Sequence, residues 1–110
     1  MTGGAYKLHR EVRADLYGYA HYIARDNPLA ARRLYDRARE TFQMLADMPL
    51  MGAPYQALRG ELSNIRFAPI KGYPNYLVFY RPGNGFIDVL CILHGKMDKD
   101  SRMASRLGSS

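Results

Sequence analysis

Apolar and polar positions alternate along three consecutive segments in the C-terminal half of the chain. We predict strands at 65–70, 76–81 and 86–94, because period-2 patterning rich in β-branched and aromatic residues is typical of strands. The last segment is apolar on both faces, which indicates a central strand covered on both sides. Residues 82–85, Pro-Gly-Asn-Gly, suit the tight turn that would join the last two strands.

Two helices are predicted ahead of these strands, at 11–25 and 28–47, because apolar residues recur there at helical spacing. Asn27 is a suitable N-cap for the second helix, and Pro28 fits its first position, where a missing N–H costs nothing. A break this short predicts an antiparallel helical hairpin. Its two apolar stripes would then lie on the apolar sheet.

The remaining segments complete the predicted fold. Residues 5–9 alternate and predict a short strand at a sheet edge, whereas residues 48–60 contain two prolines and two glycines and predict a loop. The expected fold class is α+β: an N-terminal strand and a two-helix hairpin packed on a mainly antiparallel sheet of about four strands. We expect one domain, 1–110, with a core at 5–95 and a basic tail at 96–110 that is either loose or a short helix. Strand order does not follow from the pattern.

Composition narrows the class of protein. The chain has 110 residues and a hydrophobic share of 47%, which suits one small globular domain. Its net charge of +6 favours polyanionic partners such as nucleic acid, the ribosome or an acidic protein segment, or else serves solubility alone. Cys91 is the single cysteine and has no charged neighbour in sequence, so we expect a buried thiol and no intramolecular disulfide. Because no membrane-spanning run or signal-peptide core is found, a cytoplasmic location is expected.

Familiar catalytic signatures are absent from the sequence. There is no Walker loop, no GxGxxG fingerprint and no GxSxG elbow. The histidines His9, His21 and His94 lack metal-ligand spacing, and the single cysteine adds no ligand set. We therefore expect neither a metal nor a cofactor.

The strands do contain three cationic side chains, Arg66, Arg81 and His94. If they converge on one face of the sheet, the arginines could hold a phosphate and the histidine could act as acid or base, as metal-free RNA cleavage requires. Simpler roles stay open. His94 could end a strand with a backbone hydrogen bond, and Arg66 could pair with Glu61 or Asp88.

Four segments of the chain resemble one known family. They are YIARDNP at 22–28, RFAPI at 66–70, NYLVFYRP at 75–82 and VLCILHGKMD at 89–98. With the order strand, two helices, three strands, they resemble the ParE branch of the RelE/ParE superfamily, the toxins of bacterial toxin–antitoxin pairs also called plasmid stabilisation proteins. The resemblance covers about residues 6–98.

The resemblance implies a helical hairpin on a twisted antiparallel sheet and a target inside the cell. The ParE branch is known for poisoning DNA gyrase, whereas the RelE branch cleaves mRNA in the ribosomal A site. RelE-type members use basic residues near the positions of Arg66, Arg81 and His94, and often a C-terminal aromatic. This chain has no Tyr or Phe after His94 and no lysine cluster in its second helix, and its FYRP and LHG patterns favour the ParE branch.

The implied partner is a small ParD-like antitoxin whose C-terminal segment wraps the toxin. The charge of +6 indicates that this segment is acidic and amphipathic and that it orders on binding. We expect its apolar anchors to lie in grooves beside the helices, with its carboxylates meeting Arg32, Arg33 and Arg37.

The function that we favour is inhibition of DNA gyrase by protein–protein binding, without covalent chemistry on the toxin. The basic tail would contact gyrase or its DNA through four cations, Lys96, Lys99, Arg102 and Arg106. The alternative is a ribosome-dependent mRNA endoribonuclease that uses Arg66, Arg81 and His94. A third possibility is a non-toxic scaffold or DNA-binding co-repressor.

Overall fold

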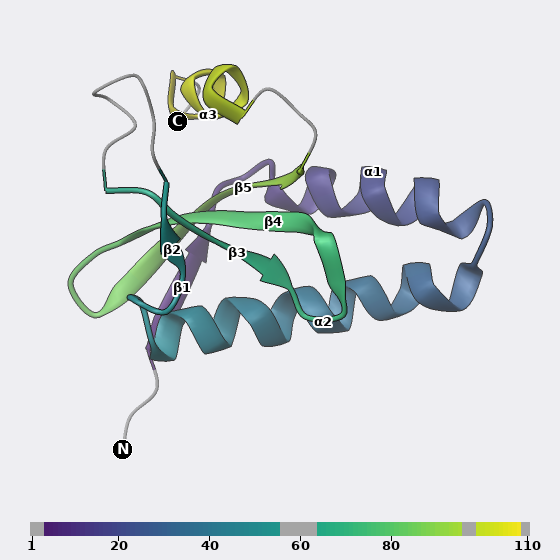
Figure 1. Cartoon of the computed structure of the whole chain (residues 1–110), viewed down its shortest axis with the longest axis horizontal. Helices are drawn as coiled ribbons and strands as arrows, with labels where there is room; N and C mark the ends of the chain where they lie inside the picture. The colour runs from purple at the N-terminus through teal and green to yellow at the C-terminus, as the bar shows by residue number, and fades with distance from the viewer. Residues whose placement is uncertain (1–3, 56–63, 96–98, 109–110) are drawn as a thin grey trace.

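The computed structural model describes residues 4–55, 64–95 and 99–108. Figure 1 shows a hairpin of two long helices that meet at one tip, strands that lie across the hairpin, and a third, separate helix beside β5. In chain order the elements are β1 (Ala5–Leu8), α1 (Val12–Ala24), α2 (Pro28–Asp47), β2 (Ala53–Pro54), β3 (Arg66–Ile70), β4 (Tyr73–Pro82), β5 (Phe86–His94) and α3 (Lys99–Gly108).

The strands form one sheet in the order β1-β5-β4-β3-β2. β1 pairs with β5 in parallel, and the other neighbours are antiparallel, so the predicted α+β class and mainly antiparallel sheet are confirmed. The sheet has five strands rather than four. The extra strand is the two-residue β2, which pairs with β3 inside the segment predicted as a loop.

The two helices of the hairpin begin and end close to the predicted positions. Asn27 accepts a hydrogen bond from the backbone N–H of Ala30 at 3.1 Å, which confirms the predicted cap of α2. Pro28 is the first residue of α2 and Asp47 the last, as predicted. Gly85 has a φ of +77° in the turn between β4 and β5, a conformation that glycine adopts without strain.

The sheet is covered on both faces, as the pattern of β5 indicates. On one face, the buried residues Val78, Tyr80 and Ile92 pack in a single cluster with the helical hairpin. On the other face, Phe79 and Leu93 belong to a second cluster. Within the described residues, no helix is both long and apolar enough to span a membrane.

The second cluster changes the prediction for the C-terminal segment. Met103 lies on α3 and is fully buried against the sheet, together with Ile65, Phe79 and Cys91. The core therefore does not end at residue 95, and residues 99–108 are a docked helix rather than a loose tail. Cys91 is buried, as predicted, and its burial raises the pKa of the thiol to about 12, although nearby Arg106 opposes the rise.

Candidate functional site

The three cations predicted to cleave RNA do not come together. Arg66 of β3 lies opposite Tyr80 of β4, and His94 of β5 lies opposite Tyr76 of β4. Those two positions are four residues apart along the strand, about 13 Å at the rise of an extended chain. Arg81 follows Tyr80 on β4, so it lies at the end of the strand away from His94. The strand register therefore separates the positions of the three residues along the sheet, and the convergence considered for them is not observed.

Arg66 instead holds the segment that leads into β2. Its guanidinium donates to the carbonyl oxygens of Leu50 at 3.2 Å and Gly52 at 2.7 Å. The buried hydroxyl of Tyr80 strengthens the same segment, because it donates to the carbonyl oxygen of Pro49 at 2.6 Å and accepts from the Gly52 N–H at 3.0 Å. These contacts give Arg66 a structural role in the fold.

Of the structural roles expected for His94 and Arg66, the structure shows the one for His94. His94 is the last residue of β5, and its backbone hydrogen-bonds the Tyr19 hydroxyl, as a strand-ending residue would. The ion pair proposed between Arg66 and Asp88 is not formed, since Asp88 lies opposite Arg81 on the β4–β5 ladder. Glu61 lies outside the described residues.

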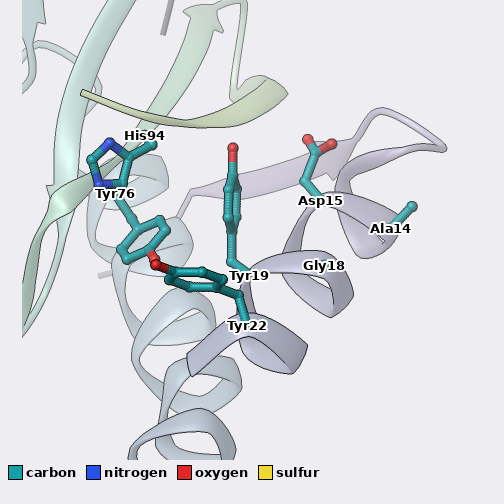
Figure 2. Close-up of a pocket in the computed structure, with 7 residues that line it drawn as sticks. All are labelled: Ala14, Asp15, Gly18, Tyr19, Tyr22, Tyr76 and His94. Atoms are coloured by element: carbon teal, nitrogen blue, oxygen red, sulfur yellow. The ribbon is translucent and has the colours of Figure 1, made fainter. Parts of the chain in front are cut away.

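An open cavity of about 490 Å³ lies between α1 and the end of the sheet, and we call it the tyrosine cavity. Figure 2 shows Tyr19 between His94 and Asp15, with the hydroxyl ends of Tyr22 and Tyr76 pointing toward one another. Its lining residues are Ala14, Asp15, Gly18, Tyr19 and Tyr22 of α1, Tyr76 of β4 and His94 of β5.

The aromatic rings that line this cavity contact one another at tilted or perpendicular angles rather than in parallel stacks. The ring centres of Tyr19 and Tyr76 are 4.8 Å apart with the planes tilted by 59°. The rings of Tyr76 and His94 are 5.3 Å apart and perpendicular. Burial raises the pKa of Tyr19 and of Tyr76, so both phenols are neutral and can donate as well as accept hydrogen bonds.

Asp15 is the acidic member of the lining, and its carboxylate is already satisfied. Arg106 of α3 donates to both of its oxygens, at 2.9 and 3.0 Å, and the backbone N–H of Ile92 donates at 3.2 Å. Arg106 also donates to the carbonyl oxygen of Leu90 at 2.8 Å. Only 16% of the Asp15 side chain and 14% of the Arg106 side chain is exposed. The hydrogen bond to Asp15 raises the pKa of Arg106, so the guanidinium keeps its charge.

A second surface runs along the seam between the two hairpin helices, and we call it the hairpin trough. Two adjoining hollows of about 570 and 320 Å³ share Tyr17 and Tyr35, so together they make one groove. One end opens at β1, at Tyr6 and Leu8, and the other end lies at the hairpin tip, at Pro28. Tyr17 is 66% exposed, unusually high for a large aromatic side chain.

Cations lie along this trough, but only one of the three predicted antitoxin contacts is among them. Arg13, Arg32 and Arg39 line the trough. Arg33 and Arg37 lie instead beside acidic residues on another face of α2, where Arg37 forms a 2.7 Å ion pair with Glu40. The exposed Tyr17 and the half-buried Tyr35 were not among the residues predicted from the sequence to contact an antitoxin. Both lie on the hairpin helices, and together they mark the groove.

The predicted target-binding cations that the structure describes have different environments on α3. Lys96 lies outside the described residues. The Lys99 ammonium donates to the carbonyl oxygen of Gly95 at 2.7 Å. Arg102 is exposed to solvent, whereas Arg106 is committed to Asp15. Arg102 and Lys99 therefore remain as candidate contacts with a target, and Arg106 does not.

Comparison with known proteins agrees with this architecture. The family described as the ParE toxin of the type II toxin–antitoxin system parDE matches residues 6–99. A solved structure of a chromosomal ParDE toxin–antitoxin system from P. aeruginosa is similar in fold, with a TM-score of 0.63 at 21% sequence identity. That match covers 83% of this chain and 95% of the other. No curated protein matches the chain.

Proposed function

The chain belongs to the ParE toxin family of type II toxin–antitoxin systems, and from that premise we propose that it inhibits growth by binding DNA gyrase. We place this action in the cytoplasm, where gyrase works on DNA. The observation that favours binding over catalysis is the separation of Arg66 from His94 along the sheet. RNA cleavage would require the arginine that holds the phosphate and the histidine that acts as acid or base to meet at one phosphate, and their separation therefore supports binding rather than catalysis.

Membership of the family implies an antitoxin partner, and we propose that its acidic C-terminal segment lies in the hairpin trough. The trough combines an apolar floor with cations along its length, which suits the apolar face and the carboxylates of an amphipathic segment. Tyr17 lies where the two hollows join, so it would be central to the interface. Central aromatic residues contribute most to such interfaces.

Tyr17→Ala is expected to weaken antitoxin binding by about tenfold or more, because a central tyrosine anchor is removed. The fold should be unaffected, since Tyr17 is 66% exposed. Binding is measured by titrating a labelled antitoxin segment, and thermal unfolding checks the fold. The matched control is Tyr22→Ala, which removes a tyrosine of the same helix that is 62% exposed but does not line the trough. Equal losses for the two variants would contradict placement in the trough.

The target is tested with purified gyrase in supercoiling and plasmid-cleavage assays. We expect the full chain to slow supercoiling and accumulate cleaved plasmid, and Arg102→Glu to weaken both effects by reversing an exposed charge on α3. No effect of the full chain at micromolar concentration would exclude gyrase. Full activity of Arg102→Glu would exclude a role for this cation while leaving the target intact.

The same preparation discriminates the ribonuclease alternative. Incubated with programmed ribosomes, the chain is expected to leave the message uncut when its ends are mapped by primer extension. Cleavage in the ribosomal A site would overturn the proposal of inhibition by binding.

A further inference from the structure

We propose that the tyrosine cavity binds an unpaired nucleobase of a single-stranded nucleic acid. This goes beyond gyrase inhibition and antitoxin binding, neither of which requires such a site. The cavity holds about 490 Å³, within the range of pockets that enclose small planar ligands. It lies on a chain of charge +6, which attracts the phosphates that accompany a base.

The walls of the cavity offer the aromatic faces that stack on bases. Tyr19 and Tyr76 both line the cavity, and their rings are tilted by 59° rather than stacked on one another. Tyr22 stands at the mouth and is 62% exposed, although a tyrosine ring in water forgoes burial of its apolar surface. The lining therefore offers three aromatic side chains, of which the exposed ring of Tyr22 is the most accessible to a stacked base.

The floor of the cavity is bare because Gly18 has no side chain. A Cβ built at Gly18 would meet nothing within 4 Å, so packing within the chain does not require glycine here. Glycine inside a helix is less stable than alanine, and the fold gains nothing in exchange. The missing side chain keeps the cavity open beside Ala14 and Tyr22.

Charges at the margin suit the phosphates on either side of a bound base. The Arg25 guanidinium lies 5.9 Å from the centre of the Tyr22 ring. Burial raises the pKa of the Tyr19 phenol, and the charge of Arg102 on α3 opposes that rise. Asp15, the acidic group among the described lining residues, is neutralised by its ion pair with Arg106.

Polar groups in the lining favour a base over an apolar side chain of a protein partner. The hydroxyls of Tyr22 and Tyr76 point toward one another at the cavity (Figure 2). An apolar anchor seated there would remove them from water without hydrogen bonds, which is unfavourable. A base edge carries donors and acceptors that can replace the water.

The test compares two labelled oligothymidylates of equal length by fluorescence anisotropy, one intact and one abasic at its central positions. Both carry the same phosphates, so only base contacts can separate them. We expect the full chain to bind the intact strand about 5- to 150-fold more tightly, the range for stacking of one base on an aromatic side chain. An oligouridylate arm shows whether DNA or RNA is preferred, and either preference supports the site.

Two substitutions at one position provide the control. Gly18→Leu fills the cavity while keeping a good helix former, so it should abolish the difference between the intact and abasic strands. Gly18→Ala should keep that difference and shift the folding equilibrium about fivefold toward the native state. Tyr17→Ala, on another face of α1, should also keep it. Equal binding of both strands by the unmodified chain, or a difference that survives Gly18→Leu, overturns the proposal, whatever the gyrase assay shows.

Discussion

Arg106→Ala is expected to destabilise the fold by about 3 kcal/mol, measured by chemical denaturation. The substitution leaves the Asp15 carboxylate without its cation, and removal of one partner from a largely buried ion pair typically costs about 3–5 kcal/mol. It also leaves the carbonyl oxygen of Leu90 without its side-chain donor. Because α3 is fixed to the sheet by this pair and by Met103, most of the loss should come from undocking of α3.

The matched control is Arg102→Ala, one turn earlier on α3 and exposed, which should change stability by about 0.5 kcal/mol or less. Replacing Asp15 and Arg106 together with leucine and methionine should restore part of the loss, since no unpaired charge remains. If Arg106→Ala and Arg102→Ala unfold at the same denaturant concentration, α3 is not held as described. A chain that ends at Gly95 would lose both anchors, so it cannot serve as a clean test of target binding.

Gly52→Ala is also expected to lower the free energy of unfolding by about 3 kcal/mol. A Cβ at Gly52 would lie 2.5 Å from the hydroxyl oxygen of Tyr80 and 2.8 Å from its ring. Tyr80 is fully buried and cannot swing away, so the methyl group must displace the backbone before β2 or the tyrosine. Either movement weakens the hydrogen bonds of the Tyr80 hydroxyl to Pro49 and Gly52.

A double-mutant cycle isolates this contact. Tyr80→Phe removes the atom nearest to the added methyl group, so the double variant should lose less stability than the two single changes summed. Gly83→Ala is the comparison, because its nearest neighbour is the partly exposed ring of Phe86 at 3.1 Å. Strict additivity at Gly52 and Tyr80 would show that the two groups do not meet.

The elements that the sequence predicts well are those with strong local signals. Asn27 and Pro28 locate the break in the hairpin to the residue, because capping is a contact between near neighbours. The strand at 86–94 was predicted with its observed limits, since its apolar run lies between turn residues. By contrast, β2 has only two residues, one of them Pro54, so it is too short to show an alternation of apolar and polar positions.

The candidate site was harder to predict because it depends on tertiary structure. Whether Arg66 and His94 meet is decided by the register of β3 and β5 against β4, and no local pattern in the sequence gives that register. Arg106 resembles any solvated cation in sequence, yet its partner Asp15 lies 91 positions earlier. On α3, Met103 and Leu107 are spaced as one face of a helix and both pack on the second cluster, but two residues make too short an apolar stripe to predict docking from the sequence.

The sequence separation between β1 and β5 also determines when the sheet can assemble during translation. β1 joins the sheet through β5, whose paired residues 86–89 are made long after residues 5–8. Contacts so distant along a chain close late, because a large loop must be ordered first. At about 5–20 residues per second, a ribosome takes several seconds to make the intervening segment. We expect the nascent hairpin to wait without its sheet for that time, so that a translating bacterium holds no complete toxin until Arg106 has emerged from the exit tunnel.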